Sequence, residues 1–131
     1  MVVHPQSTNG TNIKNMDSIE IPKSTAHIIV EIIEYVPNSV VMKTIIKRST
    51  GNISVMSFDI GEGLTEKISP FDTFAQIIDG RAEIIIDGNS QCLESGEGII
   101  IPANLSNIIK ANERFKMILT TIRSAADSEN L

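Results

Sequence analysis

Five side chains in this 131-residue sequence have the functional groups and the spacing of a small-molecule site: Lys67, Ser69, Thr73, Asn104 and Asn107. Side chains alternate along a β-strand with period two, so the odd-numbered positions of a strand share one face. An ammonium group with hydroxyl and amide neighbours is suited to hydrogen bonding a carboxylate or a sugar. Such a set could bind a small polar or anionic ligand if the fold brings these side chains together on an inward face.

Two stretches framed by glycine surround these residues. The first runs from Gly61 to Gly80, and the second runs from Gly96 through Pro102 to Asn107. Their spacing resembles the paired signature of the cupin superfamily, G-x5-H-x-H-x3-E-x6-G and G-x5-P-x-G-x2-H. The resemblance covers residues 40–122 and is nearest to small single-domain bacterial cupins. It implies an RmlC-like jelly-roll barrel with the five polar residues in its interior.

The same resemblance bears on metal binding, because cupins use four positions of the signature as ligands. Where that family has His, His, Glu and His, this sequence has Lys67, Ser69, Thr73 and Asn107. Transition-metal sites are built from three or four His, Cys, Asp or Glu groups around one point. Neither histidine of the chain falls in the two motifs. We therefore expect no metal and no cofactor.

Lys67 leaves two other interpretations open. A desolvated lysine can act as a Schiff-base amine, which would make the protein a metal-independent enzyme of the isomerase or lyase type. Alternatively, Lys67 extends to the barrel mouth and pairs with Asp72 or Glu66, and the barrel has a structural role. In that case its interior is filled by isoleucines and by Met42, Met56, Phe58 and Met117. We favour binding without catalysis, or a structural role, over an enzyme.

Short runs rich in Ile, Val, Thr and Phe predict an all-β fold, a cupin-like double-stranded β-helix. The pairs Asp79-Gly80 and Asp87-Gly88 predict tight hairpin turns, since both supply positive backbone angles at low steric cost. The predicted strands are Val40 to Ile46, Ile53 to Phe58, Phe74 to Ile78, Ala82 to Ile86, Gly98 to Ile101, Asn107 to Lys110 and Phe115 to Ile122.

The rest of the chain divides into segments around this barrel. Residues 1–15 are polar without an apolar period and predict a disordered tail. Residues 16–38 predict a helical or extended arm, with a short helix from Ser24 to about Tyr35 that carries an apolar stripe. The barrel occupies residues 39–123, and residues 124–131 form a flexible C-terminus.

Composition limits the partners of the protein. The formal net charge of -5 is opposite to what nucleic acid binding requires. No apolar run is long enough to span a membrane, and the single cysteine fits a reducing compartment, so the expected location is the cytoplasm. We also expect a homodimer, because four residues offer apolar surface beyond the needs of one core: Ile45, Phe74, Ile78 and Ile122.

Overall fold

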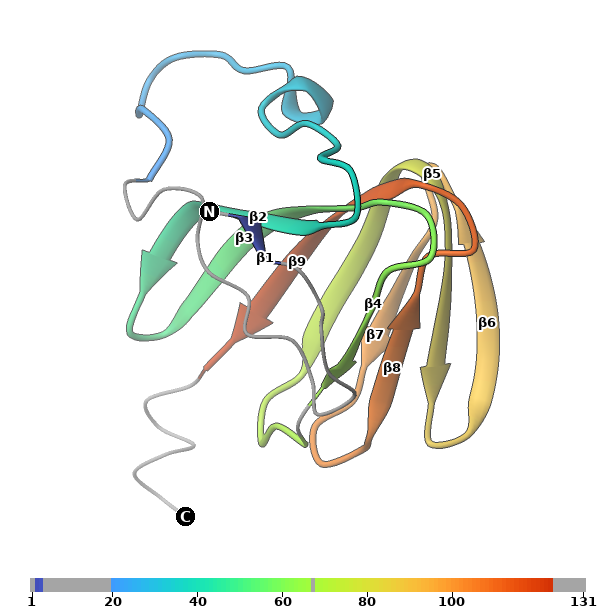
Figure 1. Ribbon diagram of the computed structural model, residues 1–131. Helices are drawn as coiled ribbons and strands as arrows, with labels where there is room; N and C mark the ends of the chain where they lie inside the picture. Colours follow the sequence, from blue (N-terminus) through green and yellow to red (C-terminus); the bar gives the residue numbers. More distant parts are fainter. Residues whose placement is uncertain (1, 4–19, 67, 124–131) are drawn as a thin grey trace.

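The computed structural model describes residues 2–3, 20–66 and 68–123, which form nine β-strands and one 3-10 turn (Figure 1). In chain order the elements are β1 (Val2–Val3), η1 (Ile29–Glu31), β2 (Val40–Arg48), β3 (Gly51–Phe58), β4 (Gly63–Glu66), β5 (Thr73–Ile86), β6 (Asn89–Glu94), β7 (Gly98–Ile101), β8 (Asn107–Lys110) and β9 (Phe115–Ile122). All pairings between these strands are antiparallel. The predicted all-β jelly roll is confirmed.

The long strand β5 joins two sheets into one curled structure. Its first half pairs with β7 and β9, and β9 continues through β3 and β2 to β1. Its second half pairs with β6 and β8, and β8 pairs with β4. In Figure 1 the two sheets curve toward each other as a half-barrel, with β4, β8 and β6 facing β2, β3 and β9.

The passage of β5 between the sheets occurs at Asp79 and Gly80, where a hairpin turn was predicted. That prediction is wrong, because the strand continues and its register with β9 shifts between Ile77 and Asp79, which is a β-bulge. Gly80 has φ +76°, and a side chain there would collide with the carbonyl oxygen of Arg114. The same pair of residues suits a tight turn and a bulge, so local chemistry could not separate them.

The second predicted turn is confirmed. Asp87 and Gly88 both have positive φ angles, 50° and 83°, and they connect β5 to β6 with Ile86 opposite Asn89. This is the two-residue hairpin that an Asp-Gly pair favours. The strands β4 and β6 were missed, since β4 has only four residues and β6 is largely exposed, so both carry little apolar alternation.

Alternation along the strands determines which side chains enter the barrel. In β5, Ala75 and Ile77 are fully buried, whereas Phe74 is 41% exposed. Ile109 and Ala111 are buried in the same cluster, together with the stacked rings of Phe58 and Phe115. The predicted inward face of these odd-numbered positions is therefore correct. Met56, Phe58 and Met117 are buried in this core, and Met42 packs against it.

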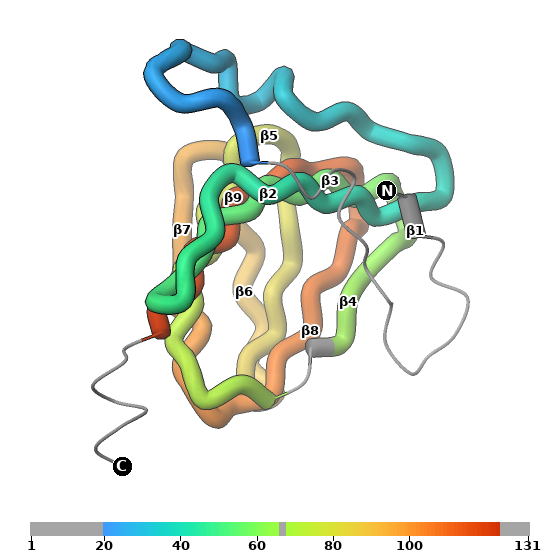
Figure 2. The backbone as a smooth tube through the Cα atoms, turned by 90° about the vertical axis from the view of Figure 1, so that its left-hand side faces the viewer, coloured from blue at the N-terminus to red at the C-terminus, as the bar shows by residue number. Residues whose placement is uncertain are grey.

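The arm that precedes the barrel lies over the outer side of β2 and β3 (Figure 2). Only the 3-10 turn Ile29–Glu31 is helical, so the helix predicted from Ser24 to Tyr35 is far shorter than expected. Ser24 has φ +60° and does not cap it. Five of the six residues from Ile28 to Ile33 are β-branched, and such side chains lose rotamer freedom in a helix, which explains the difference. No helix among the described residues could cross a membrane.

A second, smaller cluster holds the arm against the sheet. Ile33 is buried with Val41 and Val55, and Ile45 and Ile78 pack against them. These last two residues were expected to be free for dimerisation, but the arm already covers that part of the outer face.

Polar contacts fasten the end of the arm. The hydroxyl of Tyr35 donates to Oδ2 of Asp79 over 2.6 Å, and Nζ of Lys116 donates to the carbonyl of Val30 over 2.6 Å. Burial first, and then the hydrogen bond to Asp79, raise the pKa of Tyr35 above its ordinary value. The arm is thus attached to the barrel by hydrogen bonds as well as by apolar packing.

The terminal segments are described only in part. Val2–Val3 pairs with Val41 and Val40 of β2. The remainder of the predicted tail, and the predicted C-terminus 124–131, lie outside the described residues.

Candidate functional site

One end of the barrel gathers the ends of five strands. Because the strands are antiparallel, β5 and β8 begin there with Thr73 and Asn107, while β7 and β9 end there near Ile101 and Thr121. Thr73 lies opposite Ile101 on one side and Thr121 on the other. Asn107 lies opposite Ile86 and the last residue of β4. Residues far apart in the sequence therefore meet at one mouth.

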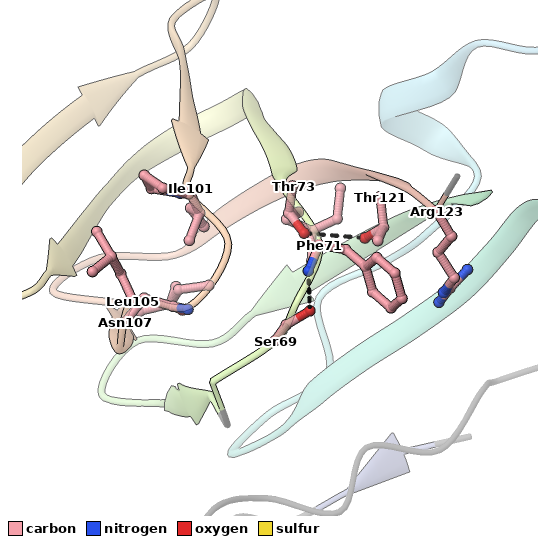
Figure 3. Close-up of a pocket in the computed structure, with 11 residues that line it drawn as sticks. Ser69, Phe71, Thr73, Ile101, Leu105, Asn107, Thr121 and Arg123 are labelled. Carbon is pink, nitrogen blue, oxygen red and sulfur yellow. Dashed lines mark hydrogen bonds between the residues drawn. The ribbon is translucent and has the colours of Figure 1, made fainter. Parts of the chain in front are cut away.

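A pocket of about 320 Å³ opens at this end. Ser69, Thr73 and Asn107, three of the predicted site residues, line it together (Figure 3). The other lining residues are Phe71, Ile101, Pro102, Leu105, Ile109, Leu119, Thr121 and Arg123. The volume lies at the lower end of the range of small-molecule sites, about 300–1,000 Å³. The pocket thus suits a small ligand.

Two loops form the rim of the pocket and are tied to each other. The backbone N–H of Asn104 donates to the carbonyl of Ser69 over 2.7 Å, and that of Ala103 donates to Oδ1 of Asp72 over 2.7 Å. Asn104 itself is exposed, has φ +66° and does not line the pocket. Asparagine tolerates this left-handed conformation better than most residues. Its place in the ligand set stays a prediction, and the contact that the structure shows for it joins the two loops.

Hydroxyl groups form one side of the pocket. The side-chain oxygens of Thr73 and Thr121 lie 3.2 Å apart, and either can donate to the other. Oγ of Ser69 accepts a hydrogen bond from the backbone N–H of Phe71 over 3.1 Å. Each hydroxyl has one donor and two acceptor positions, so these bonds leave capacity for a ligand.

Asn107 is the least satisfied polar group of the pocket. The residue is 7% exposed, and its buried Oδ1 atom has no hydrogen-bond partner among the described residues. A buried acceptor without a partner costs about 1–3 kcal/mol and is rare in folded proteins. A ligand that donates a hydrogen bond would remove this cost.

The sequence reasoning missed Arg123 and Phe71. The guanidinium carbon of Arg123 lies 5.6 Å from the centre of the Phe71 ring, and both side chains line the pocket. Arg123 follows the last residue of β9, but the inward parity of Leu119 and Thr121 extends to it. Continuing the alternation one step beyond the predicted strand could have found this cation.

The cation that was predicted, Lys67, lies outside the described residues, as does the side chain of Glu66. The proposed pairing of Lys67 with Asp72 or Glu66 and its role as an amine therefore stay predictions. The binding roles of Ser69, Thr73 and Asn107 also stay predictions, although the structure brings these three residues together.

The donor set of the pocket does not fit the metal that cupins use at these positions. Ser69 and Thr73 offer neutral hydroxyls and Asn107 a neutral amide, which are weak ligands for transition metals. Across residues 20–66 and 68–123, no three His, Cys, Asp or Glu side chains are placed to share a metal ion. We derive no chemistry through a metal in this pocket.

The two joined sheets and the pocket between them define a jelly-roll barrel protein with a pocket at one end. No protein-family model and no curated protein matches the sequence. Solved structures are similar to it over most of its length. A conserved protein of unknown function from Streptococcus pyogenes is 25% identical, with a TM-score of 0.76 over 87% of this chain and 98% of that one.

Two further structures carry the family name. A cupin superfamily protein from Desulfitobacterium hafniense is 26% identical, with a TM-score of 0.74 over 86% of this chain and 99% of that one. A cupin 2 conserved barrel domain protein from Leptotrichia buccalis is 29% identical, with a TM-score of 0.70 over 72% of this chain and 46% of that one. These likenesses in fold and sequence support the cupin superfamily for this chain.

Proposed function

We propose that this protein binds a small polar or anionic molecule in the barrel pocket without a metal and without catalysis. The observation that carries the proposal is Oδ1 of Asn107, a buried acceptor at the wall of the pocket that finds no partner in the described part of the chain. The hydroxyls of Ser69, Thr73 and Thr121 add donors and acceptors around the same space. A purely structural barrel would gain stability by filling this pocket with apolar side chains.

A ligand screen combined with one isosteric variant tests the proposal. Thermal shift with neutral monosaccharides and small organic acids should identify compounds that stabilise the wild-type protein. Asn107→Leu should be as stable as wild type, or more stable by about 1 kcal/mol, since it removes an unpaired buried acceptor. The same variant should lose the stabilisation by ligand, because the acceptor for the ligand is gone.

Neighbouring threonines of β9 provide the matched control. Thr121 lines the pocket, whereas Thr120 precedes it with the opposite parity and does not. Thr121→Val should weaken binding, and Thr120→Val should not. If no sugar or acid stabilises the wild type, or if Asn107→Leu binds as well as wild type, the pocket is not the binding site.

We also propose that the protein forms a homodimer, with a second copy of this chain as its partner. Phe74 and Ile100 are cross-strand neighbours on the outer face and are 41% and 61% exposed, and Ile122 is 68% exposed. Among the described residues β7 pairs only with β5, so its other edge offers backbone groups for pairing. Light scattering should give twice the chain mass, and a monomer at micromolar concentration would contradict the dimer.

A further inference from the structure

Arg123 differs from Arg48 and Arg114 in its surroundings. Arg48 forms an ion pair with Glu20, and Arg114 forms one with Asp59, each at 2.7 Å. No carboxylate among residues 20–65 and 68–123 forms an ion pair with Arg123. Its guanidinium instead lies over the ring of Phe71 at the pocket, where it is half-buried. A partly desolvated cation without a counter-charge favours an anion.

The backbone of Arg123 is held in place, which makes its side chain suited to binding an anionic ligand. Its backbone N–H donates to the carbonyl of Thr50 over 2.6 Å, next to the end of β9. The ring of Phe71 restricts the guanidinium plane on one side. A planar guanidinium that is held in place can bind a carboxylate through two parallel hydrogen bonds.

The side of the pocket that faces Arg123 carries Asn107, which requires a hydrogen-bond donor on the ligand. Figure 3 shows Asn107 and Leu105 on one side of the pocket, and Phe71 and Arg123 on the other. Oδ1 of Asn107 accepts and cannot donate, so it needs an O–H or N–H of the ligand. A carboxylate alone would satisfy Arg123 and leave Asn107 unpaired. A neutral sugar alone would do the reverse.

The walls between these two groups are of two kinds. Apolar side chains cover one part of the lining, and the hydroxyls of Ser69, Thr73 and Thr121 cover another. A sugar ring matches such walls, because its C–H faces are apolar and its edges carry hydroxyls. The pocket volume of about 320 Å³ limits the ligand to a small molecule.

We propose that the ligand is a hydroxy carboxylate of monosaccharide size, such as a sugar acid. Its carboxylate binds the guanidinium of Arg123, and one of its hydroxyls donates to Oδ1 of Asn107. This inference rests on the proposed binding function and adds the class of ligand and the residue that recognises its charge.

Calorimetric titration of matched ligand pairs tests this inference. The probes are galacturonate with galactose, and gluconate with glucitol, so that each acid has a neutral counterpart. In at least one pair, wild-type protein should bind the acid roughly tenfold to hundredfold more tightly, as expected for hydrogen bonds to a charged group. Arg123→Gln should reduce this preference to less than about threefold. The control is Arg81→Gln, which removes an exposed arginine remote from the pocket and should keep the preference.

The possible failures separate the two proposals. If acid and neutral sugar bind equally, and Arg123→Gln changes neither affinity, the role of Arg123 is wrong while the binding function stands. If Arg81→Gln removes the preference for the acid as well, that preference depends on the net charge of the protein and not on Arg123, and the role of Arg123 is wrong. If no probe binds, the ligand class is wrong, and the binding function fails only if the wider screen is also negative.

Discussion

The hydroxyl of Tyr35 donates a hydrogen bond of 2.6 Å to the carboxylate of Asp79, 44 positions further along the chain. Tyr35 closes the N-terminal arm, and Asp79 lies at the bulge where β5 passes from one sheet to the other. The contact therefore joins the arm to the bend that shapes the barrel.

Tyr35→Phe should lower the free energy of unfolding by about 1 kcal/mol, because it removes this hydrogen bond and leaves the Asp79 carboxylate without it. Urea denaturation provides the measurement. The control is Ser90→Ala, which removes an exposed hydroxyl that donates to Glu83 over 2.6 Å and should cost less. An effect of Tyr35→Phe no larger than that of Ser90→Ala would mean that the arm contact does not stabilise the fold.

Asp59 should make stability depend on acid pH. The backbone N–H of Asn38 and then the Arg114 guanidinium hold the pKa of Asp59 below its ordinary value. In the unfolded chain the carboxyl regains that ordinary value, close to 4. The stabilisation by Asp59 is therefore complete above about pH 4 and is lost as the pH falls through the lowered folded pKa.

Asp59→Asn should thus be less stable than wild type at pH 7, with a smaller difference at about pH 3. Urea unfolding at the two pH values measures both differences. A difference that stays constant or grows toward low pH would contradict the stabilising role of the ionised carboxylate.

The bulge at Gly80 predicts that alanine at Gly80 destabilises the protein more than alanine at Gly88. Both Gly80 and Gly88 have positive φ, so alanine at either costs about 1–2 kcal/mol in backbone strain. At Gly80 the new methyl group also meets the carbonyl of Arg114, whereas at Gly88 it meets open space. Gly80→Ala should therefore lower the melting temperature clearly more than Gly88→Ala. Equal losses would argue against the close approach of β5 and the chain before β9.

Most of the fold could be predicted from the sequence because strand alternation is a strong signal. The period-two rule correctly placed Ala75, Ile77 and Ile109 in the core, and Thr73 and Asn107 at the pocket. The long continuous strand β5 could not be predicted, because Asp79-Gly80 has the composition of a turn. The length of the helix was overestimated, although the β-branched residues between Ile28 and Ile33 already disfavour a long helix.

The site was predictable only where it coincided with the cupin signature. Ser69, Thr73 and Asn107 occupy signature positions and line the pocket. Thr121 lies near the end of β9 and Arg123 follows that strand, and no motif marks either residue. Their presence in the pocket depends on the pairing of β9 with β5, which a single sequence does not specify.

The convergence of the signature positions can be tested by building a metal site. Ser69→His, Thr73→His and Asn107→His together should bind Ni or Zn, because all three positions line one pocket. The control variant shifts each histidine by one residue, to Ile68, Phe74 and Ile108, and should not bind. Equal binding by both folded variants, or by neither, would show that the three positions do not converge.

The central claim is that a small polar molecule binds between Asn107 and the threonine pair, and amide chemical shifts measure this most directly. Nuclear magnetic resonance spectra of ¹⁵N-labelled protein are recorded while galacturonate, gluconate or malate is added. We predict that the largest shifts for at least one compound occur at Ser69, Thr73, Asn107 and Thr121, and that Asn107→Leu abolishes them. Shifts centred elsewhere, or none for any compound while the protein stays folded, would contradict the account.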